Sequence, residues 1–183
     1  MTKTLMLAGL AALVLAGCNP PRYTFEPPPS GLRLTSATRS VLVRDVSLPE
    51  YASAIEVAVA TGDGAVKNAG SALWADQPTR GVSVALARQL DMILSATVSS
   101  EPWPLGGLAE TEVSVRMSKA LGGADGIYRL EGQYYIYSER GTGQSDRFAI
   151  AEPMGGTDAG DIAAAQSRAI GALAEQIARR LGR

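Results

Sequence analysis

A short apolar run near the start of the sequence places the strongest limit on what the chain can become. Lys3 supplies a positive charge, residues 5–16 are almost all apolar, and the run ends in Leu15-Ala16-Gly17-Cys18. The run is shorter than the roughly 20 apolar residues that a transmembrane helix needs, and small residues before a cysteine are typical of a signal peptide with a lipobox. We therefore interpret residues 1–17 as a signal peptide that is cleaved between Gly17 and Cys18.

Cys18 is the only cysteine in the chain. A lone thiol has no disulfide partner in the oxidising periplasm, so we expect Cys18 to be lipidated with a diacylglycerol and an N-acyl chain. These chains bind a membrane more firmly than one acyl chain does. An Asp after the lipidated cysteine retains enterobacterial lipoproteins at the inner membrane, and here the residue is Asn19, which favours the periplasmic face of the outer membrane. The alternative is an ordinary secretory signal or a short anchor helix in which Cys18 is incidental.

The residues after Cys18 are rich in proline as far as Pro29. Such a stretch is extended and semi-rigid, so residues 18–30 are predicted to form a tether of about 30 Å. Residues 31–183 are then long enough for a single domain. The chain has 17 basic and 18 acidic residues and no basic stripe, which argues against a nucleic-acid partner. No later apolar run is long enough for a second membrane span.

Branched apolar residues predict strands at 32–34, 40–46, 55–60 and 65–72. Pro49, in the segment Leu48-Pro49-Glu50-Tyr51, is expected to end the preceding strand, because a central strand does not tolerate proline. Gly62-Asp63-Gly64 is predicted to form a hairpin turn. The apolar period then lengthens to three or four residues, which predicts an amphipathic helix ending near Ile93. Asp76 is placed to cap this helix, and Pro78 is tolerated in its first turn.

The second half of the chain is predicted to be mostly sheet until a terminal helix. Strands are expected at 97–99, 111–117, 127–137 and 147–151, separated by glycine-containing turns. The helix is predicted to begin at about Asp158 or Asp161 and to end at Leu181. Arg179 and Arg180 lie near its C-terminus, where positive charge interacts favourably with the helix dipole. Two helices with one apolar stripe each must bury those stripes on the sheet. The fold class predicted is therefore α/β, a two-layer sandwich of a mainly antiparallel or mixed sheet with two amphipathic helices on one face.

The chain contains no histidine. With Cys18 lipidated, a Ser-His-Asp triad, a Cys-His pair and a zinc site with His ligands are excluded within it. A Gly-x-x-x-x-Gly-Lys-Ser/Thr loop for ATP is absent too. We expect no metal, no cofactor and no catalysis. Glu110 with Glu112, on one strand face, and Asp158 with Asp161 are the remaining acid–base candidates, but a solvated strand edge and helix capping explain them more simply.

One aromatic residue is a candidate for partner binding. Trp103 lies between Pro102 and Pro104 in a stiff loop, where it can anchor an interface, although it can equally fold back over the core. Trp74, just before the first helix, is predicted to lie in the core. The tyrosines of the 127–137 strand are predicted to pack across strands: Tyr128, Tyr134, Tyr135 and Tyr137.

The order of these features resembles the ABC-type transport auxiliary lipoproteins, the PqiC-like family. The resemblance rests on the lipobox, the proline-rich stretch, the segment Val41-Leu42-Val43-Arg44-Asp45-Val46-Ser47-Leu48-Pro49-Glu50-Tyr51, the pair Trp74-Ala75 before a helix, and the alanine-rich terminal helix. It implies a non-enzymatic docking component of an MCE-type ABC lipid transport system between the inner and outer membranes. The implied partners are an MCE-domain protein, ABC transporter subunits and further copies of the chain in a homo-oligomer.

A second hypothesis is an independent periplasmic lipoprotein that binds a lipid or another apolar ligand itself. The two hypotheses differ in what the domain must contain. A carrier needs an enclosed apolar pocket between its helices and its sheet, whereas a docking component needs an exposed surface or an oligomer interface.

Overall fold

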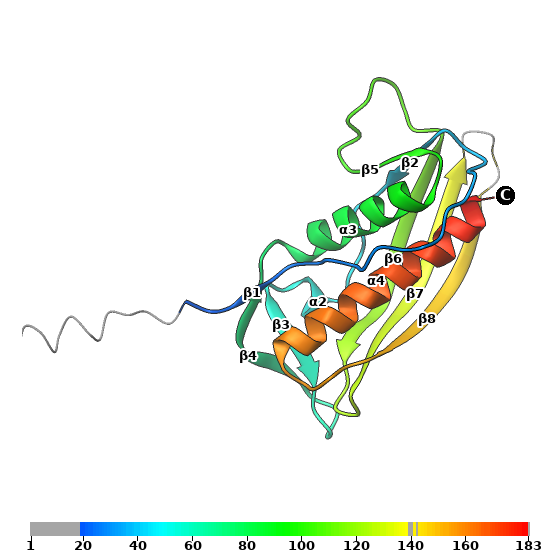
Figure 1. The fold of residues 1–183 in the computed structure, drawn as a ribbon. Helices are drawn as coiled ribbons and strands as arrows, with labels where there is room; N and C mark the ends of the chain where they lie inside the picture. Colours follow the sequence, from blue (N-terminus) through cyan, green and yellow to red (C-terminus); the bar gives the residue numbers. More distant parts are fainter. Residues whose placement is uncertain (1–18, 139–140, 142, 183) are drawn as a thin grey trace, which may run out of the picture.

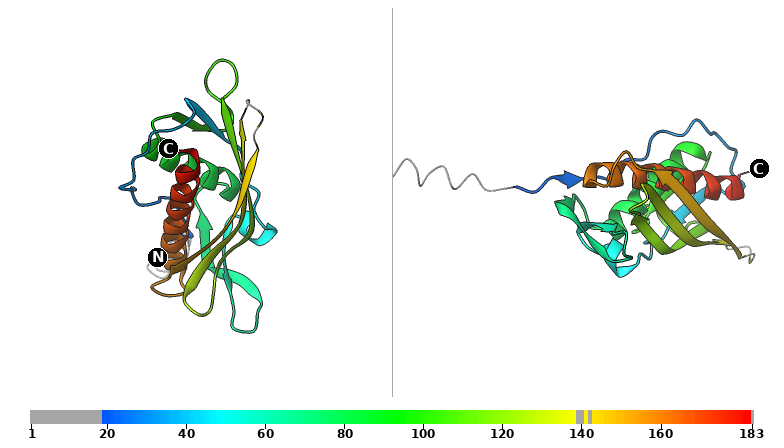
Figure 2. Two further views of the ribbon diagram at one scale, coloured as in Figure 1. Left: turned by 90° about the vertical axis from the view of Figure 1, so that its right-hand side faces the viewer. Right: turned by 90° about the horizontal axis from the view of Figure 1, so that it is seen from below.

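The computed structural model describes residues 19–138, 141 and 143–182. They form an eight-stranded mixed sheet with two long helices on one of its faces (Figures 1 and 2). This confirms the predicted two-layer α/β sandwich. In chain order the elements are β1 (Arg22–Tyr23), β2 (Ser40–Val43), α2 (Glu50–Ser53), β3 (Glu56–Ala60), β4 (Val66–Trp74), α3 (Pro78–Ile93), β5 (Thr97–Ser100), β6 (Thr111–Gly122), β7 (Ile127–Ser138), β8 (Gln144–Pro153) and α4 (Ala159–Leu181).

Strand β6 organises the sheet because it pairs along both of its edges. One edge is antiparallel to β7, and β8 extends this meander. Two strands share the other edge of β6. Strand β2 pairs with the start of β6, where Val41 lies opposite Thr111, and β3 pairs with the last residue of β6, where Val59 lies opposite Gly122. At about 3.3 Å per residue these two contacts are roughly 35 Å apart. The sheet therefore has a β2–β5 end and a β1–β4–β3 end.

The strands before α3 differ from the prediction in two places. The strand predicted at 32–34 is wrong: Leu34 forms only an isolated bridge with Leu94, because its backbone bonds to the residues that end α3. Strand β2 ends at Val43, earlier than predicted. The hairpin is confirmed, since the chain turns after β3 and Gly64 has the positive φ of 87° that its glycine permits. The predicted stop at Pro49 precedes the short helix α2.

Helix α3 buries the predicted stripe, including Leu86 and Leu90, against the sheet. Its predicted cap is wrong. The N-cap is Gln77 and makes no side-chain cap bond, because Asp76 instead accepts from the Gln77 N–H and pairs with Arg80.

Helix α4 matches its prediction at both ends. The Asp158 carboxylate accepts from the Asp161 N–H at 2.9 Å, so Asp158 is the N-cap. The helix ends at Leu181, and Arg179 and Arg180 lie in its last turn. Acids at the start and arginines at the end both favour the helix dipole.

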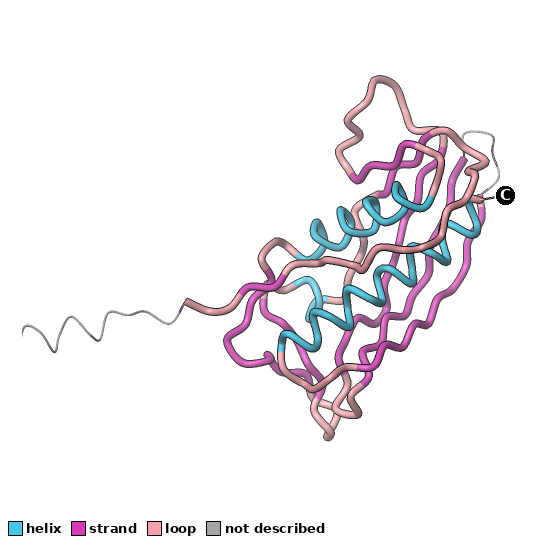
Figure 3. The backbone as a smooth tube through the Cα atoms, in the orientation of Figure 1, coloured by secondary structure: helices cyan, strands magenta, loops and turns pink. Residues whose placement is uncertain are grey.

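Residues 22–30, which the sequence predicts to be part of a free tether, instead lie on the domain. We call them the N-terminal strap. Strand β1 pairs in parallel with the end of β4, and Leu73 N–H donates to the Pro21 carbonyl at 3.0 Å. The strap then runs between the outer sides of α3 and α4 (Figures 1 and 3).

Both helices bind the strap directly. Gln89 of α3 donates its side-chain amide to the Pro27 carbonyl at 3.1 Å, and Ser167 of α4 accepts from the Glu26 N–H at 3.1 Å. Farther along, the Ser30 hydroxyl donates to Glu175 of α4 at 2.6 Å. The prolines keep the segment extended, as predicted, but the apolar side chains of Phe25 and Pro27 are buried. Burial of these side chains explains why the segment does not project freely.

Candidate interaction surface

The loop of residues 101–110 projects from the β2–β5 end of the sheet (Figure 1). We call it the β5–β6 loop. The side chains of Leu105 and Leu108 are 53% and 80% exposed. Trp103 is partly buried, and its indole N–H is shielded from solvent without a hydrogen-bond partner. The exposed apolar side chains on this loop are features expected of a contact surface rather than of a core.

Glu101 holds the first end of the β5–β6 loop. Its carboxylate accepts from the Asp45 N–H at 2.9 Å and pairs with Arg44 Nε at 3.0 Å. Arg44 also reaches Glu112 of β6 at 3.3 Å. One guanidinium therefore joins the start of the loop to the strand that follows it.

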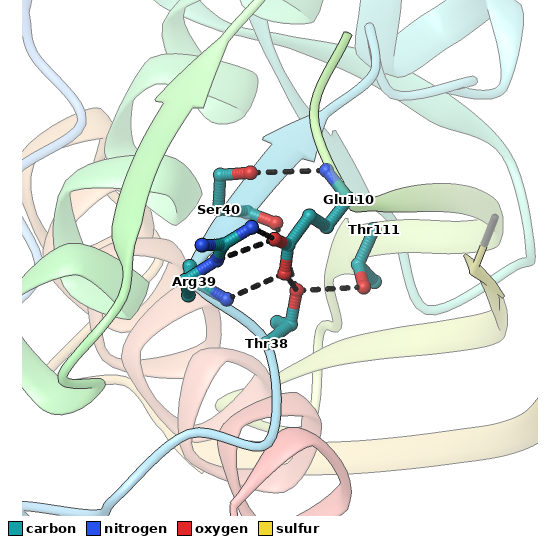
Figure 4. Close-up of polar contacts among 5 residues, drawn as sticks. All are labelled: Thr38, Arg39, Ser40, Glu110 and Thr111. Carbon is teal, nitrogen blue, oxygen red and sulfur yellow. Dashed lines mark hydrogen bonds and ion pairs between the residues drawn. The ribbon is translucent and has the colours of Figure 1, made fainter. Parts of the chain in front are cut away.

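Glu110 holds the other end of the loop (Figure 4). Its carboxylate accepts from the Arg39 N–H at 3.0 Å, from Arg39 Nε at 2.6 Å and from the Thr38 hydroxyl at 3.1 Å. Its own N–H donates to the Ser40 hydroxyl at 3.0 Å. The backbone and side-chain bonds from Arg39, with that from Thr38, lower the pKa of Glu110 from 4.5 to about 2.

The acid–base candidates of the sequence have structural partners. Glu110 lies just before β6 rather than within it, and Glu110 and Glu112 pair with different arginines, Arg39 and Arg44. Asp158 and Asp161 form the cap of α4. Among the described residues, no group of three or more Asp, Glu or Cys side chains is arranged to hold a metal ion.

The aromatic residues divide between the two faces of the sheet. Trp74 is 3% exposed, which confirms its place in the core. Tyr128 and Tyr134 are also buried on the helix-covered face, and burial raises the pKa of the Tyr128 hydroxyl. Tyr135 and Tyr137 lie on the open face, where their rings stack with centroids 6.4 Å apart.

The predicted site residues thus have two outcomes. Gly17 and Cys18 lie outside the described residues. Trp103 belongs to the exposed loop but is itself partly buried, and its role in partner binding stays a prediction. Leu105 and Leu108 were not predicted as contact residues, although the Gly106-Gly107 pair between them indicates a loop.

Comparison with known protein families gives a match over residues 23–178 to the ABC-type transport auxiliary lipoprotein component. The chain belongs to this family. The match begins within the N-terminal strap, so the strap is part of the family domain. Membership in this transport auxiliary family assigns the chain an auxiliary role in ABC-type transport and places it among lipoproteins.

Solved structures agree on the fold of this auxiliary lipoprotein. A crystal structure of an uncharacterised protein is 18% identical, with a TM-score of 0.70, and the match covers 87% of this chain and 99% of that one. A Xanthomonas campestris protein of family DUF330 is 16% identical, with a TM-score of 0.63, and the match covers 88% and 92%. A search of curated proteins gives no match. No helix in the described part of the chain is long and apolar enough to cross a membrane.

Proposed function

We propose that this protein is a non-enzymatic docking component of an MCE-type ABC lipid transport system. In this proposal the signal peptide is cleaved before Cys18, acyl chains on Cys18 anchor the protein to the periplasmic face of the outer membrane, and the domain binds an MCE-domain protein. Membership in the transport auxiliary family supports the general role. The finer assignment rests on the positions of the anchor and of the exposed loop.

The observation that carries the proposal is that the anchor and the β5–β6 loop belong to opposite ends of β6. Only Asn19 and Pro20 separate Cys18 from Pro21, which is already bonded to β4. At about 3.5 Å per residue the spacer is therefore roughly 10 Å long, and it holds the β1–β4–β3 end close to the bilayer. The β5–β6 loop begins from the other end and is free to meet a partner in the periplasm.

The alternative of an independent lipid carrier has less support. A carrier needs an apolar cavity between helices and sheet, but that space is filled by fully buried side chains such as Leu86, Leu90 and Ile170. A groove of about 750 Å³ does lie between the β3–β4 hairpin and the start of α4. Its lining mixes polar residues such as Lys67 and Asp158 with small apolar ones such as Ala69, which suits an aqueous surface better than an acyl chain.

The first test is capture of the lipidated protein from membranes after mild crosslinking, with mass spectrometry of the recovered proteins. We expect an MCE-domain protein and its ABC transporter subunits, together with crosslinked copies of the chain if it is a homo-oligomer. Recovery of bound lipid without these proteins would favour the carrier instead.

A matched pair of variants tests the anchor. Cys18→Ala removes the lipidated residue, so the protein should no longer be processed as a lipoprotein. Asn19→Asp keeps lipidation but introduces the inner-membrane retention residue, so in an enterobacterial host it should move the protein from the outer to the inner membrane. An unchanged distribution of both variants on fractionation would contradict the proposed anchor.

A further inference from the structure

Two arginines lie on the face of the sheet that the helices leave open. Arg116 of β6 is opposite Gln133 of β7, which in turn is opposite Arg147 of β8. Directly opposed residues project from the same face, and strands are about 4.8 Å apart. The Cα atoms of the arginines are therefore roughly 10 Å apart, with Gln133 between them. Both arginines are exposed, whereas Met117 beside Arg116 is buried in the core.

Neither arginine has a carboxylate partner within the described part of the chain. The guanidinium of Arg116 lies over the ring of Tyr135, 5.5 Å from its centroid. No hydrogen bond or ion pair of the Arg116 side chain accompanies this contact among the described residues, so its N–H groups are available as donors. Nearby acids are already paired, Glu131 with Lys119 and Asp146 with Arg180. The two arginines therefore leave an excess of positive charge here.

Gln133 adds a neutral donor between the two guanidinium groups. The Tyr135 hydroxyl donates to Gln133 Oε1 at 2.8 Å, which leaves the side-chain NH₂ group as the available donor. Arg116 and Arg147 thus have only donors, and Gln133 adds its NH₂ donors between them. They line a concavity of about 300 Å³ with three neighbouring residues, Met117, Ser118 and Gly132.

A site with two guanidinium groups and an amide NH₂ between them matches the oxygens of a phosphate, which can accept paired bonds from more than one arginine. We propose that this concavity binds the phosphate of a phospholipid headgroup. The choice of a lipid rests on the proposed function and on the stacked rings of Tyr135 and Tyr137 beside it. Tyr137 is 51% exposed, and tyrosine favours boundaries between polar headgroups and apolar chains.

The test is native mass spectrometry of the full-length lipidated protein in nonionic detergent, titrated with phosphatidylglycerol, with diacylglycerol or with inorganic phosphate. We expect one retained phosphatidylglycerol and no retained diacylglycerol, which lacks the phosphate. The Arg116→Gln/Arg147→Gln variant should retain phosphatidylglycerol at least about tenfold less well. Arg88→Gln is the matched control, because Arg88 is exposed on α3 and has no carboxylate partner among the described residues.

Each other result overturns part of the proposal. Equal retention of diacylglycerol, or no effect of the double arginine variant, would mean that the site does not recognise phosphate. Inorganic phosphate that binds as tightly as phosphatidylglycerol would identify a free-phosphate site. Capture of the MCE-domain protein is a separate measurement, so the lipid site and the docking function can fail independently.

Discussion

Phe25 stacks on Trp74, with ring centroids 4.5 Å apart and ring planes inclined by 24°. Phe25 is only seven residues after the cysteine that we propose to be lipidated, and Trp74 ends strand β4 just before α3. The contact joins the anchor segment to the core. A pull on the membrane anchor is therefore transmitted to the sheet within a few residues.

Phe25→Ala should lower the free energy of unfolding by about 3 kcal/mol, the lower end for loss of a buried aromatic ring, because the terminal segment can partly detach. Urea unfolding of the detergent-solubilised protein measures the change. Thr24→Ala is the control, since Thr24 is exposed and should change the free energy by less than about 0.5 kcal/mol. Equal stability of Phe25→Ala and the unmodified protein would mean that the strap is not part of the cooperative fold.

Gly81→Ala should destabilise the protein, although alanine favours a helix over glycine by about 1 kcal/mol. A Cβ at this position in α3 would collide with the ring of Phe25. Overpacking costs about 1–3 kcal/mol, so we expect a net loss of about 1 kcal/mol. Gly171→Ala in α4 is the matched control, because its Cβ would meet Pro27 at an ordinary 3.6 Å and should stabilise the protein.

A double-mutant cycle separates the clash from helix propensity. In a Phe25→Ala background the obstructing ring is gone, so Gly81→Ala should become neutral or stabilising. If Gly81→Ala remains equally destabilising in the Phe25→Ala background, contact with Phe25 is not the reason why position 81 requires glycine.

The same contact shows why some elements could be predicted and others could not. Helix α4 carries its own signals, an apolar stripe and the Asp158 cap, within a continuous segment. Strand β7 and the first half of β6 alternate in the same local way, but β6 continues to Gly122, beyond its predicted end at 117, because a register shift after Met117 interrupts the alternation. The strap has no such signal, because Phe25 is buried only where Gly81 and Gly171, far away in the sequence, leave room for the chain between two helices.

The supports of the β5–β6 loop are distant in the sequence too. Glu110 bonds Arg39, which lies 71 residues earlier, and Glu101 bonds Asp45, 56 residues earlier. Sequence spacing suggested a pair between Glu110 and Glu112 instead. The prolines around Trp103 did identify the loop, but only the fold determines which of its apolar side chains reach solvent.

Glu110 makes the support of this loop dependent on pH. Its pKa is lowered to about 2, so the carboxylate stabilises the fold fully above pH 4.5, its ordinary pKa, and loses that effect as the pH falls toward 2. The difference in the free energy of unfolding between the unmodified protein and Glu110→Gln should therefore be largest above pH 5 and should narrow in acid. A difference that stays constant from pH 6 to pH 3 would show that the ionised carboxylate is not the source of the stabilisation.

Leu105→Asp/Leu108→Asp should leave the fold intact and impair docking. Both side chains are exposed, so the free energy of unfolding should change by less than about 0.5 kcal/mol. If these leucines fill pockets of the partner, charges there should reduce recovery of the MCE-domain protein at least about tenfold, as for loss of interface anchors. Val66→Asp is the matched control, because Val66 is 44% exposed but lies beside the β3–β4 turn, on other strands than those that carry the β5–β6 loop. Equal recovery with the unmodified protein and both variants would place the docking surface elsewhere, whereas a loss with Val66→Asp alone would move it to the β3–β4 hairpin.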